Sequence, residues 1–82
     1  MEAQIAAFLK KAHPSRNEDP AISPNLFTDN WLDSLLQLRL LSFLEQECKI
    51  YVPSFQVSLK NFQTVSSIAA LVSKLQNAGP LA

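Results

Sequence analysis

The sequence contains a single glycine, a single cysteine and a single histidine among its 82 residues. One cysteine cannot form an intramolecular disulfide, and one cysteine with one histidine cannot build a zinc cluster. A serine hydrolase would need a base for its serine, a Gly-x-Ser-x-Gly turn and glycine for an oxyanion loop, and the chain has no such turn and little glycine. We therefore expect neither a disulfide scaffold, nor a metal centre, nor an enzyme.

An excess of charge of one sign is also missing, because seven Lys and Arg residues balance seven Asp and Glu residues. The neutral chain lacks the basic footprint of a nucleic-acid-binding domain, so any partner must be recognised by local pattern. The uninterrupted apolar runs are far shorter than the roughly 20 residues that span a bilayer, and the first residues do not resemble a secretion signal. These features predict a soluble cytoplasmic protein that binds neither nucleic acid nor membrane.

The chain does have enough hydrophobic residues to build one core. They make up 48% of the sequence and charged residues 17%, which is typical of a globular protein. A domain of this length buries roughly 60% of the surface that its unfolded chain exposes. We expect residues 1–82 to form a single domain, with 78–82 as a flexible tail.

The first 33 residues predict a helix followed by a long loop. Apolar residues recur at helical spacing from Glu2 to Ala12, and Pro14 ends the pattern. Residues 14–33 are rich in proline, serine and asparagine, a composition of turns and not of regular structure. A loop of this length needs anchors, and four apolar residues could supply them: Ile22, Leu26, Phe27 and Trp31. We expect a tight turn at Asn30, because asparagine tolerates a positive φ and the chain has almost no glycine.

The rest of the chain predicts three more helices. The first of them spans Ser34–Cys48, with leucines 40, 41 and 44 on one face and Asp33 or Ser34 as its N-cap. Residues 49–52 form an extended connector, because one β-like tetrapeptide has no partner strand. A short helix is expected within residues 54–61, and a final one within residues 64–77 with Thr64 as N-cap and an end near Gly79-Pro80. The predicted fold class is all-α, a bundle of three longer helices and one short one.

Ser34 is the residue whose position suggests chemistry. It lies between the long loop and the leucine-rich helix, where a phosphodiester would face the positive end of the helix dipole and unpaired backbone N–H groups. The alternative is that Ser34 only caps the helix, and for an isolated Asp-Ser-Leu tripeptide that alternative would be preferred.

The surrounding sequence resembles the acyl and peptidyl carrier proteins over residues 26–75. Asp33-Ser34-Leu35 resembles the attachment motif of that family. Four blocks match in order and spacing: Leu26-Phe27-Thr28-Asp29, the motif with its helix ending Leu44-Glu45-Gln46-Glu47, the connector ending Val52-Pro53, and Asn61-Phe62-Gln63-Thr64-Val65.

The resemblance implies a four-helix carrier bundle, acting as a monomer, that performs no chemistry itself. Ser34 would carry 4'-phosphopantetheine, transferred from coenzyme A by a phosphopantetheinyl transferase, and the arm would hold an acyl or aminoacyl group as a thioester. Asp33, as the adjacent acid, would help to orient the transferase's metal and the serine hydroxyl. Further partners would be a cargo-loading ligase or acyltransferase and the downstream biosynthetic enzymes.

Two features depart from the family pattern. Asn30 and Trp31 stand in the stretch where a glycine usually precedes the motif, and asparagine can replace it conformationally. The helix after the serine is also less acidic than in carriers of the fatty-acid type. With this less acidic helix, the chain resembles carriers of amino-acid or specialised acyl units more than housekeeping carriers.

A surface for partners is expected beside Ser34. Leu35, Leu36 and Leu38 spread over too much of the helix circumference to be buried together, so some leucine should be exposed. These leucines with Arg39 form the expected docking surface, unless the long loop folds over them or Arg39 is only a solvated charge. The rival interpretation from another class is a small helical adaptor that is never modified and uses the exposed leucines to bind a partner.

Two further reactive residues have structural interpretations. Cys48 is expected to be a small buried hydrophobic residue, because only Lys49 is near enough in sequence to lower its pKa. His13 is expected to be a helix-terminal residue that the dipole favours.

Overall fold

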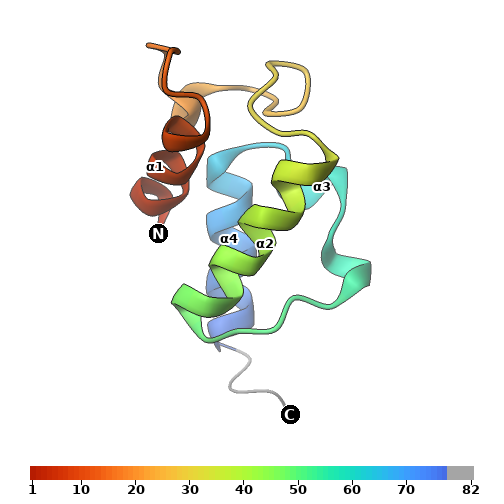
Figure 1. The fold of residues 1–82 in the computed structure, drawn as a ribbon. Helices are drawn as coiled ribbons and strands as arrows, with labels where there is room; N and C mark the ends of the chain where they lie inside the picture. The colour runs from red at the N-terminus through yellow and green to blue at the C-terminus, as the bar shows by residue number, and fades with distance from the viewer. Residues whose placement is uncertain (78–82) are drawn as a thin grey trace.

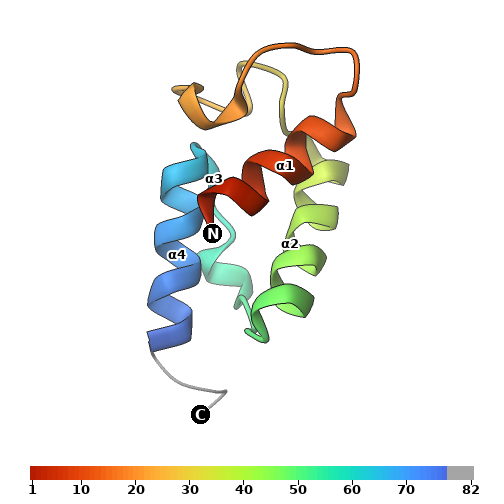
Figure 2. The same cartoon turned by 90° about the vertical axis from the view of Figure 1, so that its left-hand side faces the viewer.

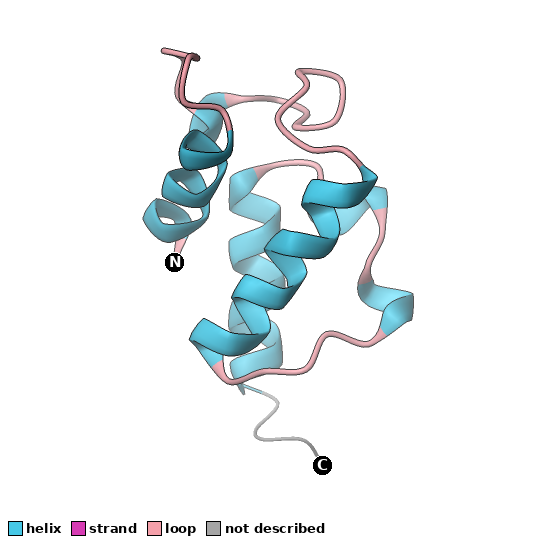
Figure 3. Cartoon of the chain, in the orientation of Figure 1, coloured by secondary structure: helices cyan, strands magenta, loops and turns pink. Residues whose placement is uncertain are grey.

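The computed structural model describes residues 1–77, and within them all regular structure is helical (Figures 1 and 3). The elements in chain order are α1 (Glu2–Ala12), the 3-10 helix η1 (Pro20–Ile22), α2 (Ser34–Cys48), the 3-10 helix η2 (Ser54–Gln56), α3 (Leu59–Phe62) and α4 (Val65–Asn77). The predicted all-α bundle with three longer helices and a short one is confirmed. The expected flexible tail and the Gly79-Pro80 helix end lie outside the described residues.

Helices α2 and α4 stand alongside each other, and α1 lies across them (Figures 1 and 2). The core lies between these helices, and its buried hydrophobic residues come from every α-helix and from the loops: Ile5, Leu9, Leu26, Trp31, Leu32, Leu40, Leu44, Val52, Phe62, Val65, Ile68, Leu71 and Val72. Leu41 packs against this core from its edge. The predicted apolar face of α2 is therefore the face that turns inward.

The helix ends follow from local polar chemistry. Asp33 is the N-cap of α2, and its carboxylate accepts a hydrogen bond from the backbone N–H of Leu36. Thr64 precedes α4, where its hydroxyl accepts from the N–H of Ser67 and the Ser67 hydroxyl accepts from the N–H of Thr64. At its C-terminus α2 stops because Lys49 adopts the left-handed conformation, with φ 55°.

Three sequence-based expectations need correction. The long loop is not free of regular structure, because the Asp19 side chain caps the short η1 helix by accepting from the N–H of Ala21. Ile22 is not an anchor, since its side chain is 80% exposed. The short helix expected within residues 54–61 consists of two pieces, η2 and α3, and the second extends to Phe62, whose ring is fully buried.

Trp31 is the main anchor of the loop. Its side chain is 2% exposed, and the Arg16 guanidinium lies 3.8 Å from the centre of its ring. Its backbone carbonyl accepts a hydrogen bond from His13 Nε2 at 3.0 Å, and its N–H donates to the Leu26 carbonyl at 2.8 Å. Trp31, three positions before Ser34, thereby contacts the end of α1 at His13 and the loop residues Arg16 and Leu26.

The expected turn at Asn30 is confirmed, because its φ is 64°. The N–H of Asn30 donates to the Phe27 carbonyl, and Asn25 Oδ1 accepts from the N–H groups of Phe27 and Thr28. A backbone hydrogen bond of 2.6 Å from Leu26 to the Gln63 carbonyl joins this turn to the junction of α3 and α4. The loop is thus fixed at both its start and its end.

Replacing Trp31 with alanine tests this anchorage. We expect Trp31→Ala to lower the free energy of unfolding by about 3–5 kcal/mol, because it removes a fully buried indole and leaves a cavity. Urea denaturation followed by far-UV circular dichroism measures the change. Ile22→Ala is the matched control in the same loop, and its effect should stay within about 0.5 kcal/mol because the side chain is exposed. Equal effects of the two substitutions would contradict the assignment of Trp31 as the anchor.

Candidate functional site

Ser34 is the first residue of α2 and is exposed to solvent. The sequence left open whether Asp33 or Ser34 caps the helix, and the structure assigns the cap to Asp33, at 2.8 Å from its Oδ1 to the Leu36 nitrogen. Within residues 1–77 no group is hydrogen-bonded to the Ser34 hydroxyl. The hydroxyl is therefore free of the structural role that the capping interpretation gave it.

The electrostatics at Ser34 favour a negative substituent. The first-turn amides of a helix have no intrahelical acceptors, and they carry the positive end of the helix dipole. No acidic residue lies in the first turn of α2, so Asp33 at the N-cap is the carboxylate next to Ser34. A phosphodiester on this hydroxyl would stand in solvent beside N–H groups that attract it.

Within residues 1–77 no hydrogen bond joins the Ser34 hydroxyl to a side chain that could act as its base. The one histidine, His13, is engaged through Nε2 with the Trp31 carbonyl and packs edge-on against the Trp31 ring at 5.4 Å. Among residues 1–77 no three histidine, cysteine, aspartate or glutamate side chains gather as a metal site would require.

The leucines after Ser34 divide between solvent and core. Leu35 and Leu38 are 62% and 60% exposed, whereas Leu36 is half-buried against the core. The expectation that some leucine stays exposed beside Ser34 is confirmed, and the loop does not cover it. Arg39 is exposed one position further along α2. Of the four residues expected to form a docking surface, three are exposed to solvent: Leu35, Leu38 and Arg39.

A hollow of about 230 Å³ adjoins the start of α2, between it and the end of α1. Its lining residues are Ala12, His13, Asp33, Leu35, Leu36 and Arg39. Sequence reasoning placed His13 only at a helix end and did not bring it to this site. Nothing in the local sequence signals its bond to Trp31, because the two residues are 18 positions apart.

The remaining candidates have structural roles. Cys48 is half-buried and not fully buried as expected; this burial, with a smaller effect of Glu47, raises the pKa of its thiol, so the cysteine is a poor nucleophile. Glu45 accepts a hydrogen bond at 2.9 Å from the backbone N–H of Val52, which fixes the connector after α2. No described helix has both the length and the apolar character that crossing a membrane requires.

Comparison with known proteins gives one informative likeness. No family model matches the chain. Over 48 residues the chain is 35% identical to the acyl carrier protein AsbD of Bacillus anthracis, and the matched segment covers 58% of this chain and 53% of that protein. The chain thus matches about half the length of this curated relative. The likeness supports a distant relationship with the acyl carrier proteins.

Proposed function

We propose that this protein is a carrier whose Ser34 is modified with 4'-phosphopantetheine and presents an acyl or aminoacyl group to partner enzymes. The observation that carries the proposal is the free, exposed Ser34 hydroxyl at the first position of α2, with the cap supplied by its neighbour Asp33. The likeness to an acyl carrier protein supports it independently of that geometry.

The residues around Ser34 fit such an arm. The hydroxyl faces solvent and makes no hydrogen bond within residues 1–77 that modification would break. In the modification the Ser34 oxygen attacks the phosphate of coenzyme A next to the pantetheine, a phosphoanhydride bond breaks, the adenosine bisphosphate leaves and the hydroxyl proton is lost. The negative phosphodiester that results lies at the positive end of α2.

The arm supplies a thiol that holds the cargo as a thioester, while the protein positions it. The chain contributes by keeping Ser34 at a fixed place, since the loop before it is tied to α1 through Trp31 and to the α3–α4 junction through Leu26. It also contributes a surface that a partner can recognise beside the arm. The low acidity of α2 favours an aminoacyl or specialised acyl cargo over a fatty-acid type.

Intact-mass measurement tests the attachment site. Incubation with coenzyme A and a broad-specificity transferase should add one phosphopantetheine to the wild-type chain and none to Ser34→Ala. Because Asp33 supplies the cap, the free energy of unfolding of Ser34→Ala should differ from that of the wild type by no more than about 0.5 kcal/mol. Ser42→Ala, an exposed serine on the same helix, should be modified normally. An unmodified wild type would favour the adaptor interpretation, and a modified Ser34→Ala would place the arm elsewhere.

Asp33 offers a test that separates its cap from its charge. Asp33→Asn keeps a side-chain oxygen for the Leu36 N–H, so stability should be retained, whereas Asp33→Ala should cost about 0.5–2 kcal/mol. Both variants should be modified more slowly if the carboxylate helps to orient the transferase's metal and the hydroxyl. Initial rates of modification and urea denaturation give the two readouts. Normal rates for Asp33→Asn would show that the carboxylate acts only as a cap.

The exposed part of the docking surface should recognise partners through apolar contact more than through charge. Leu35 and Leu38 are exposed beside the arm, whereas Glu45 lies about 16 Å along the axis from Ser34 and bonds to the connector. Attraction between opposite charges is screened within about 10 Å at 0.1 M salt, whereas apolar contact is not. Loading by a dedicated enzyme should therefore depend only weakly on salt.

Charge reversal at Arg39 completes this test. Arg39→Glu should slow loading by the dedicated enzyme and leave the fold intact, because the side chain is exposed. Loading rates of wild type and variant across a salt series provide the measurement, and Lys74→Glu on the distant end of α4 is the control. A steep salt dependence of the wild type, or equal rates for both variants, would refute the proposed surface.

A further inference from the structure

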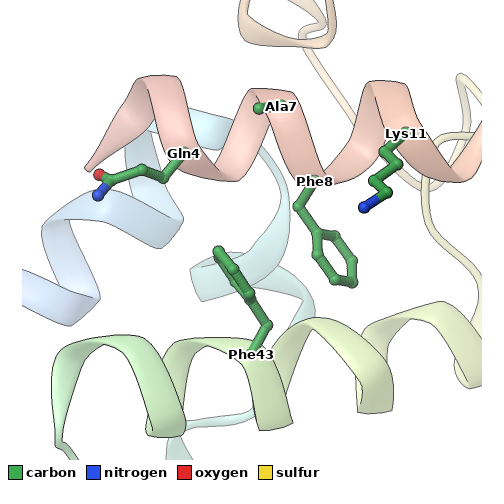
Figure 4. Close-up of a pocket in the computed structure, with 5 residues that line it drawn as sticks. All are labelled: Gln4, Ala7, Phe8, Lys11 and Phe43. Atoms are coloured by element: carbon green, nitrogen blue, oxygen red, sulfur yellow. The ribbon is translucent and has the colours of Figure 1, made fainter.

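A groove runs along the surface between α1 and α2. Its wide end is an open pocket of about 510 Å³ (Figure 4), and a hollow of about 250 Å³ continues it. The groove remains because α1 packs closely on α4 and η1 but approaches α2 less closely. We call this surface the α1–α2 groove. It is lined chiefly by Phe8 and Lys11 of α1 and by Leu36, Arg39 and Phe43 of α2.

The wide end of the groove is aromatic and only half covered. The rings of Phe8 and Phe43 lie with their centres 5.1 Å apart and their planes tilted by 33°. Figure 4 shows the two side chains extending toward each other from the two helices, with Lys11 beside them. Both phenylalanines are half-buried, so an apolar side chain from another protein can bury further area against them.

Two cations border the next part of the groove. Lys11 and Arg39 both line the smaller hollow, and none of the residues that line it is acidic. Both side chains are exposed, and the only ion pair within residues 1–77 joins Arg16 and Glu18, so neither cation is paired there. Asp33 lines the adjoining hollow, where its carboxylate is engaged as the cap of α2. The groove thus offers an apolar site next to a site for a carboxylate.

The spacing of these groups is that of one face of a helix. Phe43, Arg39 and Leu36 follow one another along α2 at intervals of four and three positions, which together span about 10 Å of the axis. A helix that lies along the groove presents side chains at i, i+4 and i+7 over the same length. An apolar residue at i reaches the phenyl rings, an acidic residue at i+4 reaches the two cations, and an apolar residue at i+7 reaches Leu36.

Other occupants match the groove less well. An interface between two copies related by a two-fold axis has the same patch on both sides, so the cations of one copy would lie against those of the other. A bilayer takes up an apolar helix face that inserts into it, whereas the two phenyl rings line a hollow. An acidic amphipathic helix satisfies both the charge of the groove and its concave shape.

We propose that the α1–α2 groove is a docking site for a helix of a partner protein that has apolar residues at i and i+7 and a carboxylate at i+4. Leu38 and Ser34 precede Phe43 by five and nine positions, which places them about 140° and 180° around α2 from it. A helix bound in the groove leaves both residues accessible. The partner can therefore hold the chain while an enzyme acts at Ser34, and the docking site does not require the modification of that serine.

The test uses the unmodified full chain and an alanine-rich helical peptide with leucine at i and i+7 and glutamate at i+4. Titration of isotope-labelled protein should shift the amide signals of the α1–α2 groove, and nuclear Overhauser contacts should join the leucine methyls to the rings of Phe8 and Phe43. Affinity should fall as salt rises, because salt screens the attraction between the glutamate and the cations. Shifts centred on Leu35 and Leu38, or no shifts at all, would overturn the proposal.

A matched pair of variants tests the cation that belongs to this groove alone. Lys11→Glu should weaken binding of the peptide about tenfold, because it sets a like charge against the glutamate. Lys10→Glu makes the same charge change at the neighbouring position of α1, outside the groove lining, and should bind as the wild type does. A second peptide with lysine at i+4 should bind Lys11→Glu more tightly than wild type, which a misfolded variant cannot do. Equal affinities of the two variants for the first peptide would refute the role of Lys11.

Two further results would assign the groove to another occupant and overturn the proposal. Concentration-dependent shifts of its signals in the free chain, with a doubled mass in sedimentation, would make it an interface between copies. Binding to phosphatidylglycerol vesicles that Lys11→Glu abolishes and Lys10→Glu does not would make it a membrane contact. Intact mass measures the modification of Ser34 separately, so the two proposals fail independently.

Discussion

The position of Ser34 depends on the burial of Trp31. The twenty-residue segment with three prolines has only short local stretches of hydrogen bonding, such as η1, and loop closure has an entropic cost that packing must offset. The Trp31 indole is buried and lies under the Arg16 guanidinium. The backbone carbonyl of Trp31 accepts a hydrogen bond from His13. One residue thus joins the end of α1 to the start of α2, and the proposed attachment site inherits its rigidity from that contact.

Asp33 and Ser34 divide two tasks that either residue type could perform. Both aspartate and serine are good N-caps, and each has the oxygen that an orphan amide needs. Because Asp33 takes the cap, Ser34 falls on the first helical position, where its hydroxyl points to solvent and its surroundings favour a negative group. A shift of the helix start by one residue would consume the hydroxyl in the cap. The register of α2 is therefore as important to the proposed function as the presence of the serine.

The neutral overall charge shifts recognition to local contact. With seven residues of each sign the protein offers no strong long-range field, and Leu35 and Leu38 stay exposed beside Ser34. Exposed leucines so close together on one helix suit binding to a partner.

The sequence alone determined the helices and the candidate serine, because both depend on local patterns. Apolar spacing predicted α1, α2 and the course of α4, and the scarcity of glycine pointed to Asn30 as the turn. Only the tertiary structure decided which of Asp33 and Ser34 caps α2, that Ile22 faces solvent, and that His13 and Arg16 bind Trp31. The contact between the rings of Phe8 and Phe43 likewise needed the packed bundle. Periodicity gives the face of a helix, but contacts between residues distant in sequence are set by how the helices cross.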